Sequence, residues 1–122
     1  MKNVFRRRLL RAVYELEPLL TEIATLLDRS EADDDPAELE RALTDGYAQA
    51  LTLEAERSSL ERRVLRLTLE LDEESGPTLT EVKALAQQLH HCEDSSERLR
   101  GELDRLKARH SRAVHDRPGW AS

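Results

Sequence analysis

Apolar side chains recur along this chain at alternating steps of four and three residues, which is the period of one face of an α-helix. Three such runs predict helices over residues 4–29, 36–74 and 79–116. The first stripe comprises Leu9, Val13, Leu16, Leu20, Ile23 and Leu27. The second comprises Leu39, Leu43, Gly46, Ala50, Leu53, Arg57, Leu60, Val64, Leu67 and Leu71. The third comprises Val82, Leu85, Leu89, Cys92, Ser96, Leu99, Leu103, Leu106, His110 and Ala113. We therefore expect one helical domain over residues 1–116, followed by a flexible tail over residues 117–122.

Local signals mark where two of these helices begin. Asp35 can accept hydrogen bonds from the free amides of a first turn, and Pro36 fits the first helical position. Thr78 and Glu81 stand three residues apart, the spacing of a capping box. The segment 75–77, Ser-Gly-Pro, is expected to end the second helix.

The second and third helices are similar in length and joined by about five residues, which predicts an antiparallel hairpin. Residues whose numbers sum to about 152 should then lie level, which places Gly46 beside Leu106. By the same reasoning the first helix should end about halfway along the hairpin, and Pro18 should kink or briefly break it. The predicted fold is all-α: an elongated three-helix protein with a short bent N-terminal helix packed on a long antiparallel coiled-coil hairpin.

The hairpin tip is the part of this fold that its own chain leaves uncovered. Two helices alone bury too little to cover their apolar side chains, and Leu65 and Leu69 add a second apolar row there. We expect either a homodimer or binding of another helical protein through the tip. The residues predicted for this interface are Val64, Leu65, Leu67, Leu69, Leu71, Val82, Leu85 and Leu89. The paired heptad helices and leucine-rich faces are similar in layout to small cytoplasmic export chaperones of flagellar and type III secretion systems, which implies an adaptor or chaperone-like role.

Composition narrows the alternatives. The chain has 122 residues, 39% apolar and only 3% aromatic, and 22 of them are leucine, which disfavours sheets and barrels. No apolar run approaches the roughly 18–20 residues that a membrane-spanning helix requires. Cys92 is the only cysteine, so no internal disulfide is expected, and a cytoplasmic location is the natural expectation.

Charge is arranged in blocks, within a formal net charge of −6. Residues 1–14 hold five bases and no acid, while residues 15–56 hold thirteen acids and two bases. The cluster of Arg6, Arg7, Arg8 and Arg11 can neutralise acidic helix faces, or it can contact the phosphates of an anionic partner. A small nucleic-acid-associated protein is therefore the alternative to an interaction module.

No combination of residues predicts catalysis, a cofactor or a metal site, so we do not expect an enzyme. The three residues 90–92, His-His-Cys, are consecutive, and consecutive helical residues point about 100° apart, which prevents them from converging on one ion. His110 falls in the third stripe and is expected to be structural. Nucleophile motifs and glycine-rich phosphate loops are absent from the sequence.

Two further features have a structural and a functional interpretation. Arg57 and Ser96 interrupt the second and third stripes at one level, which predicts a polar layer that fixes helix register or, alternatively, a buried site for an acidic ligand. Trp120 is the only tryptophan and lies in the tail, where it can anchor the chain on a partner or simply fray.

Overall fold

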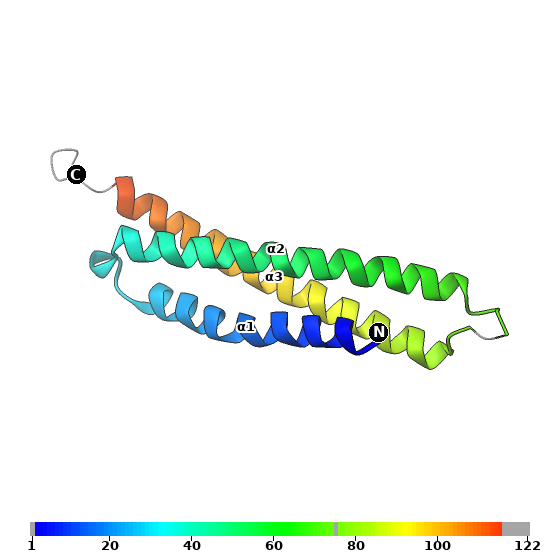
Figure 1. Ribbon diagram of the computed structural model, residues 1–122. Helices are drawn as coiled ribbons and strands as arrows, with labels where there is room; N and C mark the ends of the chain where they lie inside the picture. The colour runs from blue at the N-terminus through cyan, green and yellow to red at the C-terminus, as the bar shows by residue number, and fades with distance from the viewer. Residues whose placement is uncertain (1, 75, 116–122) are drawn as a thin grey trace.

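The all-α prediction is confirmed. A computed structural model describes residues 2–74 and 76–115, with side chains from residue 15 onward. Its elements are α1 (Lys2–Asp28), a short 3₁₀ turn η1 (Glu31–Asp33), α2 (Pro36–Leu69) and α3 (Leu79–His115). Figure 1 shows α2 and α3 folded back on one another as a long hairpin, with α1 lying along the part of the hairpin opposite its tip.

The predicted helix starts are formed by the expected side chains. The Asp35 carboxylate accepts a hydrogen bond from the amide of Ala37 at 3.1 Å, and Pro36 occupies the first turn of α2. At the start of α3, the Thr78 hydroxyl accepts from the Glu81 amide at 3.2 Å. Glu81 in turn accepts from the Thr78 amide at 3.4 Å, which completes the capping box.

α1 continues through Pro18, so the break that was one of the two expected effects of this proline does not occur. A second expectation about the helices is wrong in detail. α2 ends at Leu69 and not at residue 74, because the chain leaves the helix in a series of turns in which the amides of Glu70 and Glu73 donate to the carbonyls of Arg66 and Glu70. Gly76 closes this turn, where a β-carbon would overlap the carbonyl oxygen of Glu70.

The earlier end of α2 shifts the register of the hairpin by about one helical turn. The connection between Leu69 and Leu79 is centred near residue 74, whereas the sequence places it near residue 76. Gly46 therefore faces Leu103, one turn from the expected Leu106. At the same seam, the Cys92 thiol donates to the backbone carbonyl of Leu53 at 3.4 Å.

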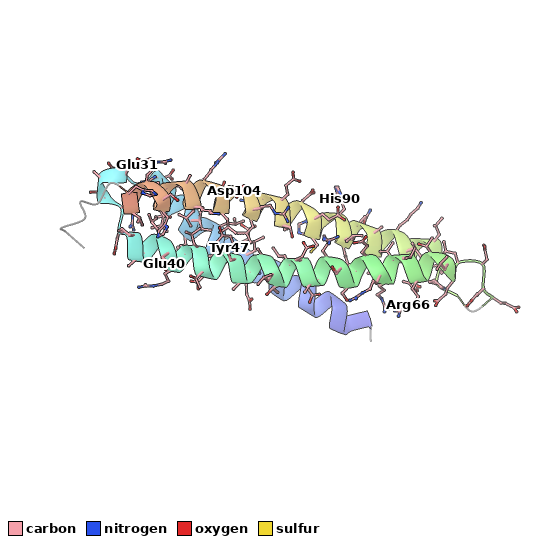
Figure 2. The ribbon with its side chains drawn as sticks, turned by 90° about the horizontal axis from the view of Figure 1, so that it is seen from above. Glu31, Glu40, Tyr47, Arg66, His90 and Asp104 are labelled. Atoms are coloured by element: carbon pink, nitrogen blue, oxygen red, sulfur yellow. The ribbon has the colours of Figure 1, made fainter. Side chains whose placement is uncertain are left out.

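One continuous core runs along the three helices. Its fully or nearly fully buried members are Leu16, Leu20, Ile23, Leu26, Leu39, Ala42, Leu43, Leu53, Leu60, Leu85, Cys92, Leu99, Leu103 and Leu106. The described α1 residues in this core all come from its C-terminal half. In both views the N-terminus of α1 lies short of the hairpin tip (Figures 1 and 2). It nevertheless reaches well past the middle of the hairpin, so the expectation that the first helix ends about halfway is wrong.

Candidate functional site

An exposed apolar row on α2 is the most distinctive surface of the described chain. Leu65 and Leu69 are 63% and 75% exposed, although both belong to a well-formed helix. Leu51 is 73% exposed and Tyr47 45% exposed, further from the tip. We call these four residues the outer row of α2.

The outer row is a single line along the helix. Successive helical residues rotate by about 100°, so Leu51 and Leu65, fourteen residues apart, differ by only about 40° in direction. The spacing of Tyr47 to Leu51 and of Leu65 to Leu69 is four residues in each case. Leu60 is fully buried and lies on a different face of α2. The outer row therefore points away from the core and does not pack into it.

The eight residues predicted for the tip interface fall into exposed, buried and partly buried groups. Leu65 and Leu69 are exposed, as expected. Leu85 and Val82 are buried, so the expectation that Leu85 is uncovered is wrong. The contacts of Glu17 with Arg98 and of Leu27 with Arg109 place the first turn of α1 level with Leu85. The remaining four, Val64, Leu67, Leu71 and Leu89, are partly buried.

Sequence reasoning missed half of the outer row. Tyr47 and Leu51 fall between members of the main stripe of α2, where isolated apolar residues are common on helix surfaces and need no explanation. Their spacing could have indicated a shared face, since Leu51 precedes Leu65 by two heptads. The spacing is informative only once the structure shows that Tyr47 and Leu51, as well as Leu65 and Leu69, are exposed.

The expected polar layer at Arg57 and Ser96 is not formed. The Arg57 side chain is 30% exposed and forms ion pairs along its own helix, with Glu54 at 2.5 Å and Glu61 at 2.7 Å. Hydrogen bonding to Glu54 raises the pKa of Arg57, and the same contact lowers the pKa of Glu54. Arg57 avoids the core because carboxylates one turn away on either side hold its guanidinium at the surface.

At two positions of α3, the buried residue is the one just before the residue that the apolar stripe predicts for the core. Ser95 is buried where the stripe predicts Ser96, and Arg109 is buried where it predicts His110. A straight helix drifts relative to a strict seven-residue repeat, so the buried face moves gradually around α3. Arg109 is the consequential case, because it brings a charge into the interior.

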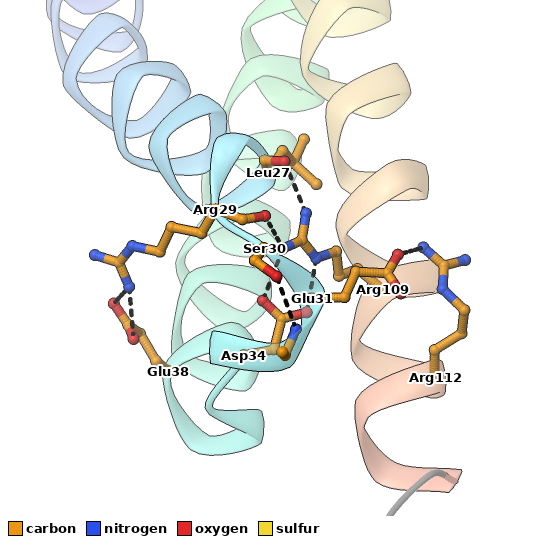
Figure 3. A network of polar contacts seen from close by, with 9 residues as sticks. Leu27, Arg29, Ser30, Glu31, Asp34, Glu38, Arg109 and Arg112 are labelled. Atoms are coloured by element: carbon orange, nitrogen blue, oxygen red, sulfur yellow. Dashed lines mark hydrogen bonds and ion pairs between the residues drawn. The ribbon is translucent and has the colours of Figure 1, made fainter.

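Arg109 joins α3 to the end of α1 and to the connector, at the end of the bundle opposite the tip (Figure 3). Its Nε donates to Asp34 Oδ2 at 2.6 Å and its Nη2 donates to Asp34 Oδ1 at 3.0 Å, a two-pronged ion pair. Its Nη1 donates to the carbonyl of Leu27 at 2.7 Å, and Nη2 also donates to the carbonyl of Arg29. A side chain of α3 thus satisfies the free carbonyls at the end of α1 and holds the connector to α2.

We call this cluster the Arg109 clamp. Its polar groups are hydrogen-bonded to one another, and its ion pair is almost completely shielded from solvent. The Arg109 and Asp34 side chains are 7% and 5% exposed. The hydrogen bonds to Asp34 raise the pKa of Arg109 above its ordinary value. Outside the clamp, Arg112 binds Glu31 at 2.8 Å and Arg29 binds Glu38 at 3.1 Å, both at the surface. Four of the five N–H donors of Arg109 are used within the clamp, which ties α3 to the end of α1 and to the connector.

Residues 90–92 diverge, as the sequence predicts. His90 and His91 are exposed, and His90 Nε2 lies 3.5 Å from the Asp94 carboxylate on the next turn. Cys92 points into the core, where burial raises the pKa of its thiol. Within the described residues, no group of three or more histidine, cysteine, aspartate or glutamate side chains is placed to hold a metal ion.

Several predicted contacts lie outside the described part of the chain. Arg6, Arg7, Arg8 and Arg11 belong to α1, but their side chains precede the described ones. Trp120 follows residue 115, the last described residue. Of the helices described, none combines the length and the apolar character needed to cross a membrane.

Comparison with known proteins adds no relative. No protein-family model, curated protein or solved structure matches this chain.

Proposed function

We propose that this chain is a non-enzymatic helical interaction module that self-associates through the exposed leucines near the hairpin tip. The observation that supports this most directly is the exposure of Leu65 and Leu69 on adjacent turns of one helix. Fully burying one leucine side chain favours association by about 1.5–3 kcal/mol, and a symmetric dimer uses each leucine twice. An adaptor, scaffold or chaperone-like role would use the same surface.

The test is the size of the assembly in solution. Sedimentation or light scattering of the wild-type chain should show an oligomer whose population rises with protein concentration. The double substitution Leu65→Glu and Leu69→Glu should give a monomer with an unchanged helical circular dichroism spectrum, because neither side chain contributes to the core.

A matched control places the same two charges elsewhere. Ala108 and Ser111 are exposed on α3, far from the tip, so Ala108→Glu with Ser111→Glu should leave the oligomer intact. A wild-type chain that stays monomeric at several hundred micromolar would contradict the proposal. An oligomer that survives the substitutions at Leu65 and Leu69 would contradict the assigned surface.

A further inference from the structure

The outer row of α2 is nearly symmetric about Ser58. Leu51 and Leu65 stand seven residues before and after Ser58, and Tyr47 and Leu69 stand eleven residues before and after it. Seven residues fall about 20° short of two turns and eleven residues pass three turns by about 20°, so all four side chains lie within about 20° of the direction of Ser58.

This symmetry is what an isologous helix pair requires. We propose that two copies of this chain pair through α2 in antiparallel orientation, around a two-fold axis beside Ser58; this inference rests on the proposed self-association and specifies its geometry. Leu51 then lies level with Leu65 of the second copy, and Tyr47 lies level with its Leu69. Each apolar contact occurs twice.

The residues near the axis suit a close approach of two helices. Ser58 and Ala55 are small, and the larger apolar side chains stand on either side of them along the helix. The nearby carboxylates of Glu54 and Glu61 are already bound by Arg57 of the same helix. They would therefore meet the second copy with their charge largely neutralised.

Charge distribution favours the antiparallel arrangement over the other symmetric ones. The turn after α2 carries Glu70, Asp72, Glu73 and Glu74 within five residues. A parallel pair, or a pair joined tip to tip, would bring two of these acidic turns together. An antiparallel pair instead keeps the two acidic turns apart and places each of them level with residues 42–46 of the other α2, a range in which Asp45 is the only acid.

The size of the surface sets the expected strength. The outer row is about 33 Å long, since it spans 22 residues at about 1.5 Å each, and it is only one helix wide. It therefore buries less than the roughly 800 Å² per partner of a standard interface. We expect a concentration-dependent dimer that exchanges readily.

Cysteine cross-linking distinguishes the geometries. In a Cys92→Ala background, whose fold is checked by circular dichroism, Ser58→Cys should oxidise to a covalent dimer because the residue lies beside the axis. Thr68→Cys, which keeps the outer row intact, should not cross-link, because the two copies of residue 68 would lie about 30 Å apart. Cross-linking through Thr68→Cys would overturn the antiparallel geometry and leave self-association standing, whereas a monomer would overturn both.

A charge substitution far from the tip gives an independent test with the native cysteine in place. Leu51→Glu should weaken dimerisation about tenfold or more, although Leu51 lies about 27 Å along α2 from Leu69. Thr52→Glu is the control, because Thr52 is exposed and adjacent but points about 120° from the row. Equal dimerisation of Leu51→Glu and wild type would confine the interface to the tip and overturn the α2 pairing.

Discussion

At the scale of single residues, Gly46 shows how tightly the hairpin seam is filled. A β-carbon at Gly46 would overlap Leu103 Cδ2 and lie 3.3 Å from Leu103 Cγ. Leu103 is itself only 2% exposed, so it has little room to move away. Gly46→Ala gains up to about 1 kcal/mol of helix propensity, but overpacking costs about 1–3 kcal/mol. We expect a lower melting temperature by circular dichroism.

Gly101 is the matched control. It lies on the exposed side of α3, and a β-carbon there meets no atom within 4 Å. Gly101→Ala should therefore raise the melting temperature through helix propensity alone. A rise for Gly46→Ala of similar size would show that the seam has a gap at Leu103.

Cys92 should be a poorly reactive thiol. Its pKa is raised mainly by burial and next by the negative charge of Glu56, so little thiolate forms at pH 8 in the folded chain. Reaction with a disulfide reagent should be slow in buffer and rapid in denaturant. Rapid reaction of the native chain would show that the seam opens at this level.

The same shift has a consequence for stability. Below the unfolded-state pKa the Cys92 thiol is protonated in both states, and its contribution is fully present. As the pH rises through the folded-state pKa that contribution is lost, because the unfolded chain releases the proton more easily. The free energy of unfolding should therefore fall on the alkaline side.

At the scale of elements, the Arg109 clamp holds the end of α1 against α3. Arg109→Met would leave Asp34 buried without its cation and free the carbonyls of Leu27 and Arg29. Removing one partner of a buried ion pair costs about 3–5 kcal/mol. Urea unfolding should show a loss near the lower end of that range, together with faster proteolysis of the connector.

Arg112→Met serves as the comparison. Arg112 pairs with Glu31 at the surface, where both side chains are more than half exposed, and such pairs contribute about 0–1 kcal/mol. A loss of similar size in the two variants would mean that the buried position of Arg109 has no special importance.

The helices themselves could be predicted because their signals are local. Asp35, Thr78 and Glu81 act within one turn of their own positions, and the structure confirms each cap. The end of α2 and the hairpin register could not be predicted, because both depend on how the turn after Leu69 folds. The pattern also could not decide between a kink and a break at Pro18, because a helix packed along one side can stay continuous after losing one backbone hydrogen bond.

At the scale of the whole molecule, α1 ends short of the hairpin tip, which divides the bundle into a three-helix part and a two-helix part. The last fully buried residue of α2 is Leu60, and beyond it Val64 and Leu67 are only partly covered. Backbone amides over residues 65–69 and 79–83 should therefore exchange hydrogen faster than those over residues 92–109. Hydrogen exchange of the dilute chain measures this, and uniform protection would show that the tip is as stable as the rest.

The candidate surface was only partly accessible from the sequence for a related reason. Leu65 and Leu69 form a second row beside the main stripe, so a local pattern identifies them. Tyr47 and Leu51 can be assigned to the same surface only once the structure shows that they are exposed together with Leu65 and Leu69. Arg109 was missed because a helix pattern places it beside the core and does not show the connector that folds over it.

The Arg109 clamp also determines the order in which the chain can assemble. Arg109 is 75 residues from Asp34 and 82 residues from Leu27 along the sequence. During synthesis, α1, the connector and α2 are all made before Arg109 is added. Contacts between neighbouring helices close shorter loops and form sooner. The end of α1 is therefore held first against α2, through the nearby pair Arg29 and Glu38, and its attachment to α3 through Arg109 forms later.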